Sequence, residues 1–347
     1  MPWLLWTVLL APVGRAAEVT DMAPARRGDL RVEYLGDYWK GHLRQDGEDY
    51  GLRRLHTSAL RYTLEFAPTD GLAIWLRADQ VASERLAFEG ASAMGRDPAT
   101  GNATYARSPP LGSDVVHKGS GLRGVWLGVG VTPYARSWGE HLARSTWRLD
   151  AGLRMPDPQH TFFTTKGDHR GVAPGGFGVL VQGAFSSDHD PVDFYLVLRG
   201  QLETAATVDV IDEDGTTRIS GAKVHAPDTF DARSGVELKA WERDDGSEFA
   251  FDLFCGYRYT GWSQVPSGVL LPDVLDATRT EVVPSSDYLS FHGGVGVIAH
   301  VMQGVTLRAA VRAEYALPHR PEDPYPVVLG ADTYGIGADA SVTGHFR

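Results

Sequence analysis

The chain of 347 residues has little cysteine, fewer basic than acidic residues, and no recognised catalytic motif. Cys255 is the single cysteine, which excludes an internal disulfide and a cysteine-rich zinc site. The 33 Lys and Arg residues are outnumbered by 44 Asp and Glu residues, and the net charge of -11 argues against a nucleic-acid partner. Because G-x-S-x-G, H-E-x-x-H, C-x-x-C and the P-loop are absent, the sequence implies no cofactor and no metal.

Long apolar runs are also missing outside the first residues, "MPWLLWTVLLAPVGRAAEV". There, an apolar core of about ten residues is followed by the small residues Gly14 and Ala16, the pattern of a secretory signal peptide. The core is shorter than the roughly 20 residues that a membrane-spanning helix needs. We therefore expect a signal peptide at 1–16, a short N-terminal tail at 17–28 and the folded domain at 29–347.

What the sequence has in abundance is alternation with a period of two. In "ALRYTLEF", Leu60, Leu64 and Phe66 share one face, whereas Arg61 and Glu65 lie on the other. This pattern is typical of strands with one apolar and one polar face, and no segment shows a convincing period of 3.6. About twelve such segments occur, at 30–39, 59–66, 72–79, 123–131, 146–154, 177–185, 192–202, 236–240, 249–259, 288–300, 305–315 and 332–346.

The connectors between these segments alternate in length. Short connectors with good turn residues lie at 68–71, 187–191, 243–247 and 302–304, and 133–141 is somewhat longer. Long connectors rich in Gly, Pro, Asp, Ser and Thr lie at 41–52, 84–120, 155–175, 205–231, 263–286 and 317–331. Tight turns at one end and long loops at the other predict an all-β, antiparallel, up-and-down arrangement of about twelve strands.

Charged residues of both signs occupy the polar face in the middle of the strands. A soluble β-sandwich shows the same alternation. The strand lengths, the asymmetry of the connectors and the aromatic residues at strand ends favour a membrane barrel instead. Those aromatic residues are Tyr38, Trp39, Trp138, Trp147, Tyr259, Trp262, Tyr288, Tyr315 and Tyr334. In such a barrel the candidate lumen- or pore-lining residues are Arg61, Glu65, Arg77, Arg148, Asp150, Arg199, Asp252, Arg258, Arg308, Arg312 and Glu314.

This layout resembles a bacterial outer-membrane β-barrel protein over nearly the whole mature chain. The likeness implies short periplasmic turns, long extracellular loops, contact with outer-membrane lipid and lipopolysaccharide, and both termini in the periplasm. In that family the last strand, usually ending in Phe, is the signal for the barrel-assembly machinery. Here the last strand ends at Phe346, with Arg347 after it. The oligomeric state is left open by the sequence.

Two functions agree with a charged lumen. Arginines on the inner face would attract anionic solutes and make a narrow, porin-like channel for passive passage of small polar or anionic molecules. Alternatively, charges of both signs would satisfy one another and close the lumen, leaving a structural barrel with surface loops. We expect a protein that is not an enzyme.

Three smaller features of the sequence suggest other functions. His56 and Ser58 share the apolar face, as in outer-membrane lipid hydrolases, but no orienting third group is evident. His292 and His300 share the inward face of one strand, where hydrogen-bonded histidines are commoner than metal ligands. The acidic residues at 209–214 do not have the spacing of a calcium loop, so we expect a solvated loop.

Overall fold

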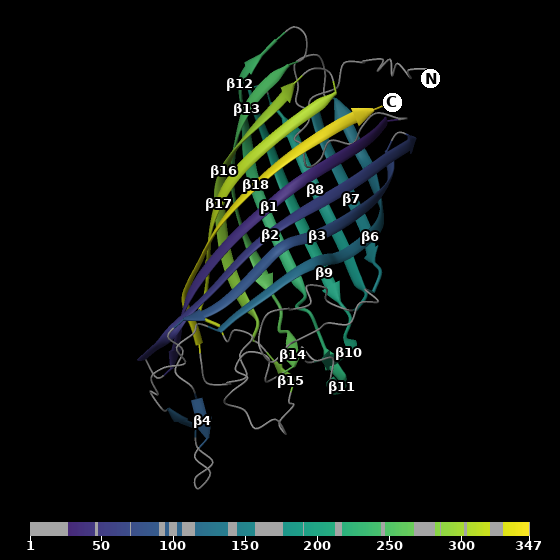
Figure 1. The fold of residues 1–347 in the computed structure, drawn as a ribbon. Helices are drawn as coiled ribbons and strands as arrows, with labels where there is room; N and C mark the ends of the chain where they lie inside the picture. The colour runs from purple at the N-terminus through teal and green to yellow at the C-terminus, as the bar shows by residue number, and fades with distance from the viewer. Residues whose placement is uncertain are drawn as a thin grey trace, which may run out of the picture.

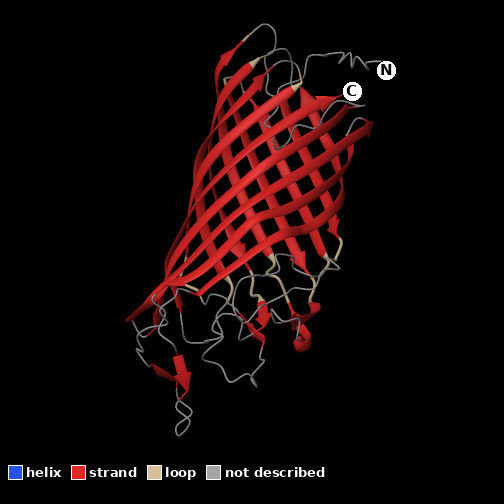
Figure 2. Cartoon of the chain, in the orientation of Figure 1, coloured by secondary structure: helices blue, strands red, loops and turns tan. Residues whose placement is uncertain are grey.

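The computed structural model is a closed β-barrel (Figure 1, Figure 2). It describes residues 27–45, 48–69, 71–89, 94–96, 103–105, 115–137, 144–156, 176–189, 191–211, 217–243, 247–266, 282–284, 286–301, 304–319 and 329–346. The expected signal peptide, most of the expected tail, Trp138 and residues 212–214 of the acidic loop lie outside these ranges. The described residues contain no helix long and apolar enough to cross a membrane.

Twelve antiparallel strands form the barrel in the order β1-β18-β17-β16-β13-β12-β9-β8-β7-β6-β3-β2, which confirms the predicted fold class. Their bounds are β1 (Arg27–Gln45), β2 (Glu48–Thr69), β3 (Leu72–Glu89), β6 (Val115–Ser137), β7 (Arg144–Arg154), β8 (Gly178–Asp188), β9 (Val192–Glu203), β12 (Thr229–Glu242), β13 (Glu248–Thr260), β16 (Tyr288–Val301), β17 (Val305–Ala316) and β18 (Leu329–Phe346).

Three two-stranded hairpins lie beyond the barrel wall. They pair β4 (Met94–Arg96) with β5 (Ala103–Tyr105), β10 (Ala206–Ile211) with β11 (Thr217–Val224), and β14 (Gln264–Pro266) with β15 (Val282–Pro284). All three are at the end of the barrel opposite the chain termini (Figure 1). The hairpins β10-β11 and β14-β15 also contact one another, so part of this end carries folded structure of its own.

The barrel closes where the first strand pairs with the last. The register runs from Gly28 opposite Phe346 to Arg44 opposite Leu329, with an irregularity between Lys40 and His42. At the terminal end, a Cβ on Gly28 would lie only 2.3 Å from the ring of Phe346. The aromatic residue at the end of the chain therefore packs across this seam, where only a glycine leaves room for it.

The outer face of the barrel is a continuous apolar surface. Its large side chains are close to half exposed, for example Leu153 at 55%, Val181 at 57% and Ile336 at 61%. In water, apolar surface of this extent would be very unfavourable, whereas a closed barrel with all strands paired is suited to a hydrocarbon surrounding. The buried fraction is instead largely polar: Asp252 and Ser290 are 0% exposed. The alternation thus places apolar side chains on the outer face of the barrel and charged side chains in its lumen.

Expectations about local structure were wrong in two respects. Residues 41–52 are not a long loop, because β1 extends to Gln45 and β2 begins at Glu48. Both ends of the expected loop at 84–120 are also strand, since β3 extends to Glu89 and β6 begins at Val115. Strand pairing here continues past the apolar band, where the outer face no longer has to be apolar and the sequence resembles a loop. Trp39 and Tyr288 were expected in an outer aromatic girdle. Instead the Trp39 ring packs over Gly335, and Tyr288 stacks on His319 with 4.0 Å between ring centroids.

Candidate functional site: the charged lumen

Long inward side chains lie flat along the barrel wall, and glycines make this possible. A Cβ on Gly235 of β12 would lie 2.4 Å from the hydroxyl oxygen of Tyr195, which crosses β12 from β9 to reach β13. Likewise, a Cβ on Gly337 of β18 would lie 2.7 Å from the guanidinium of Arg312, which crosses from β17 to Asp37 on β1. Glycine is required at these positions because any side chain would displace the crossing group.

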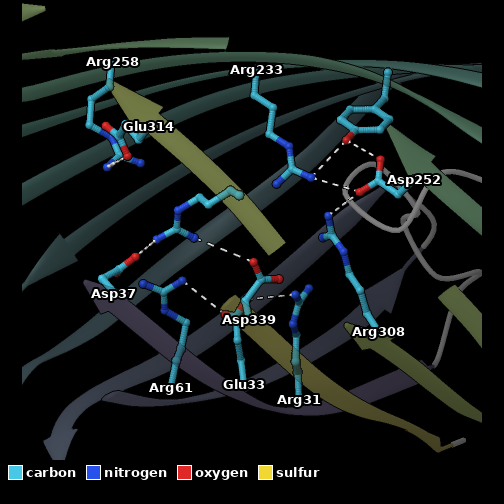
Figure 3. A network of polar contacts seen from close by, with 12 residues as sticks. Arg31, Glu33, Asp37, Arg61, Arg233, Asp252, Arg258, Arg308, Glu314 and Asp339 are labelled. Carbon is cyan, nitrogen blue, oxygen red and sulfur yellow. Dashed lines mark hydrogen bonds and ion pairs between the residues drawn. The ribbon is translucent and has the colours of Figure 1, made fainter. Parts of the chain in front are cut away.

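The side chain of Asp252 on β13 is the centre of one cluster. It accepts a hydrogen bond of 2.7 Å from the Tyr195 hydroxyl, one of 2.7 Å from Arg308 and one of 3.1 Å from Arg233. The Arg233 guanidinium also lies 3.7 Å from the centroid of the Phe254 ring. Asp252 has no exposed surface, so its charge is balanced entirely by these neighbours. We call Tyr195, Arg233, Asp252 and Arg308 the Asp252 cluster (Figure 3).

A second group of charges lies on β1, β2 and β3. Arg61 binds Asp79 at 2.7 Å. Arg61 also binds Glu33 at 3.2 Å, and Arg31 binds Glu33 as well (Figure 3). Arg77 also contacts Asp79, at 3.2 Å. Two carboxylates are therefore shared among three arginines in this sector.

The Trp126 ring supports this sector from the neighbouring strand. The guanidinium of Arg77 lies 4.7 Å from the ring centroid, and that of Arg154 lies 5.4 Å from it. Arg154 is held in turn by Glu203, with an Nη1–Oε1 distance of 2.9 Å. Cations over an indole face gain favourable electrostatic energy, and more so when they are shielded from water. Trp126 is only 2% exposed, so it holds both arginines against the wall.

Arg199 on β9 has different surroundings. Its Nε donates a hydrogen bond of 2.9 Å to Oε1 of Gln182, and the described residues supply no carboxylate within ion-pair distance of it. Between β9 and β2 lie four strands, β8, β7, β6 and β3, so Arg199 and Arg61 are on nearly opposite walls. The charge of Arg199 nevertheless repels those of Arg61 and Arg77. The side chains of facing walls therefore approach one another in the lumen.

A chain of hydrogen bonds crosses four strands near the termini. Asp29 on β1 lies 2.7 Å from Nδ1 of His345 on β18, whose Nε2 is 3.1 Å from the hydroxyl of Thr306 on β17. The same hydroxyl lies 3.0 Å from Nδ1 of His300 on β16. The predicted hydrogen-bonded lumen histidine is confirmed for His300. His292, the other predicted histidine, is buried on the same face. No cluster of His, Cys, Asp or Glu with metal-binding geometry occurs among the described residues.

Most of the predicted lumen-lining residues are joined into ion pairs on the inner face. Arg148 binds Glu65 at 2.7 Å and Asp150 at 2.8 Å. Arg258 binds Asp231 at 3.0 Å and lies 3.8 Å from Glu314. Their role in lining a pore remains a prediction. The remaining predicted residues fall in the groups described above, namely Arg61, Arg77, Arg199, Asp252, Arg308 and Arg312.

Some members of these groups were not among the sequence-based candidates. Glu33, Asp37 and Asp79 have the same two-residue period as their neighbours, so the alternation of their strands was a sufficient signal. Tyr195 had no such signal, because "DFYLVLRG" is apolar on both faces at that point. Its role depends on a partner 57 residues away, which only the fold reveals.

The His56 and Ser58 pair lies on the outer wall, as its parity indicated. Ser58 does not bond to His56; its Oγ lies 3.3 Å from the hydroxyl oxygen of Tyr34. Within the described ranges, no carboxylate or amide is hydrogen-bonded to the His56 ring. The two residues therefore do not form a nucleophile and base pair in this structure.

Comparisons with known proteins bear on the fold only. No protein-family profile matches the chain, and no match was found among curated proteins. Among solved structures, an outer membrane channel from Pseudomonas putida F1 is similar at 12% identity and a TM-score of 0.55, covering 95% of this chain and 99% of that one.

Two further solved structures are more distant. The translocator domain of the autotransporter NalP from Neisseria meningitidis has 9% identity and a TM-score of 0.39, covering 95% of this chain and 91% of that one. A FadL homologue from Pseudomonas aeruginosa has 10% identity and a TM-score of 0.38, covering 93% and 90%. The closed twelve-stranded antiparallel wall, its apolar exterior and its charged interior show that this chain has the fold of the bacterial outer-membrane β-barrels.

Proposed function

We propose that this protein is a narrow, porin-like channel of the outer membrane that passes small polar or anionic solutes without an energy source. The observation that carries the proposal is the arrangement of the lumen side chains. They lie along the wall, held by ion pairs and by glycines under their stems, as Tyr195 does over Gly235. An eight-stranded barrel is filled by its side chains, whereas a twelve-stranded one encloses a wider space.

A second candidate is a closed barrel whose lumen is shut by its own ion pairs. The observation in its favour is the dense pairing at Glu33, which is bound by Arg31 and Arg61 and is also within electrostatic range of Arg199 and Arg308. These residues come from β17, β1 and β2, which lie within one run of four strands, and from β9 on the opposite wall, so the charges reach across the lumen. Charges that satisfy one another in this way would seal the barrel without any apolar plug.

Single-channel recording in a planar lipid bilayer separates the two candidates. The refolded full chain is expected to give discrete, ohmic openings, and a salt gradient is expected to give a reversal potential that indicates preference for anions. The same preparation, heat-denatured before addition, serves as the control. A complete absence of openings at every voltage, from a preparation shown to be folded, would replace the channel with the closed barrel.

The proposed location depends on export and assembly. We propose that the segment 1–16 directs export and that the last strand presents Phe346 to the barrel-assembly machinery before β18 pairs with β1. Phe346 is outward, 42% exposed and packed over Gly28. The substitution F346A is expected to reduce the folded protein in outer-membrane fractions of a Gram-negative host. Unchanged levels would count against this signal.

A further inference from the structure

The arginine at position 199 carries donors that the described part of the protein leaves unused. Only its Nε is engaged, by the neutral amide oxygen of Gln182 at 2.9 Å. Gln182 itself is anchored by a weak contact of 3.4 Å to Asp150. The two terminal nitrogens of Arg199, with four N–H groups between them, contact none of the described carboxylates. This arginine is therefore held by a neutral amide and makes no direct ion pair with a described carboxylate, while Asp231, its register partner on β12, acts on it at longer range.

The facing and neighbouring walls hold no described carboxylate that pairs directly with Arg199. Arg61 and Arg77 lie across the lumen and share the carboxylate of Asp79. The carboxylates within electrostatic range of Arg199 are Asp231 and Glu33, and both already bind other arginines: Asp231 binds Arg258 at 3.0 Å, and Glu33 binds Arg61 and Arg31. Of Arg61, Arg77 and Arg199, only Arg199 therefore has no ion pair to a described carboxylate.

An arginine without an ion pair is unfavourable in a lumen partly removed from water unless an anion enters, and like charges on facing walls add to this cost. Other arginines of the lumen bind carboxylates directly, as Arg233 and Arg308 bind Asp252 and Arg154 binds Glu203. The arrangement at Arg199 is thus an exception to the protein's own pattern, and an exception of this kind is expected at a binding site.

We propose that Arg199, facing Arg61 and Arg77 across the lumen, binds a small oxyanion, a carboxylate or a phosphate, as it passes through the barrel. This inference rests on the proposed channel function and names the solute class for it. The free edge of the Arg199 guanidinium presents two parallel N–H donors, which match the two oxygens of a carboxylate or phosphate. The Gln182 amide fixes the plane of the fork. We call Arg61, Arg77, Arg199 and Gln182 the Arg199 constriction.

The test compares three variants of the full chain. R199Q removes the charge, R199K keeps the charge but loses the fork, and R243Q removes one charge from the turn at the end of β12, outside the constriction. Anion-to-cation permeability is measured in bilayers, and relative permeability is measured for acetate, phosphate and chloride. The unfolding midpoint in detergent is measured with each salt at equal ionic strength, because a ligand that binds only the folded state raises it.

R199Q is expected to lower the anion-to-cation permeability ratio by roughly an order of magnitude, because one unit charge at about 5 Å in water favours an anion about fourfold and disfavours a cation about fourfold. R199K is expected to keep this ratio but to lose the preference for oxyanions over chloride, and R243Q is expected to match the wild type. Acetate, phosphate or both are expected to raise the unfolding midpoint of the wild type more than chloride does, and to lose this advantage in R199Q.

The outcomes distinguish the proposed oxyanion site from the proposed channel function. If the wild type conducts and R199Q behaves like R243Q in both measurements, the oxyanion site is wrong and the channel stands. If the wild type never opens but an oxyanion stabilises it through Arg199, the site stands and the channel is wrong. A response to acetate alone assigns the site to carboxylates, and a response to phosphate alone assigns it to phosphates. Equal effects of all three salts overturn the site.

Discussion

The Asp252 cluster and the Arg199 constriction are built from similar side chains on the same inner wall, but they differ in how donors and acceptors are matched. In the Asp252 cluster, one buried carboxylate receives a tyrosine and two arginines. In the Arg199 constriction, Arg61 and Arg77 share Asp79, whereas Arg199 is held by the Gln182 amide and has no ion pair with a described carboxylate. The first arrangement is complete without a ligand, whereas the second is not.

The difference shows how one kind of residue serves two purposes. A buried carboxylate that accepts hydrogen bonds from three side chains holds the strands of the wall together, and its removal leaves uncompensated charges. A guanidinium with unused donors contributes little to the stability of the barrel wall, but it attracts an anion from solution. The number of partners, rather than the residue type, therefore separates structural from solute-binding charges in this lumen.

The largest expected effect follows from breaking the Asp252 cluster. The substitution D252A leaves the buried Arg308 and the half-buried Arg233 without their shared carboxylate, and it is expected to lower the free energy of unfolding by about 3–5 kcal/mol. Urea unfolding in detergent micelles, followed by tryptophan fluorescence, measures this. D231A is the matched control, because Arg258 then keeps Glu314 at 3.8 Å. A similar loss in both variants would mean that Asp252 contributes no more to the free energy of unfolding than Asp231 does.

An intermediate effect is expected from the glycine beneath Tyr195. In G235A, the new methyl group would lie 2.4 Å from the Tyr195 hydroxyl oxygen and 2.7 Å from the backbone oxygen of Leu253. The tyrosine must leave Asp252 or the strand must shift, at a cost of about 1–3 kcal/mol.

Gly200 on β9 offers the control for this prediction, since a Cβ there meets no atom within 4 Å. Because alanine loses less conformational entropy than glycine in a strand, G200A is expected to be neutral or stabilising by about 0.5–1 kcal/mol. Urea midpoints of the two variants decide the matter. If G235A is as stable as G200A, the flat packing of Tyr195 over β12 is not tight.

The smallest expected effect is that of Q182A, which tests how Arg199 is oriented in the Arg199 constriction. Q182A removes the bond that orients Arg199 but no charge, so the free energy of unfolding is expected to change by less than about 1 kcal/mol. The preference for oxyanions over chloride is expected to weaken by less than in R199Q. S186A, at another inward position of β8, serves as control. A stability loss as large as that of D252A would make Gln182 part of the structural framework instead.

Much of the wall was predictable from the sequence because side chains in a strand alternate between two faces. Leu60 and Arg61 are neighbours in the chain but face hydrocarbon and lumen, and no further information is needed to separate them. The rule failed where outer residues are not apolar, as in the extensions of β1 and β2 across 41–52. It also failed for Trp39, whose aromatic character suggested a girdle while its packing over Gly335 places it inside.

The sequence by itself determined the approximate number of barrel strands, the direction of most wall side chains and the mixed charge of the lumen. Only the tertiary structure decided which charges meet, because many partners come from strands that are not adjacent or are far apart in the chain. Arg312 and Asp37 are 275 residues apart, and they meet only because the barrel closes between β1 and β18 and leaves Gly337 between them. Closure and the placement of glycines, which alternation does not encode, determine which arginines are neutralised and which face the lumen with donors to spare.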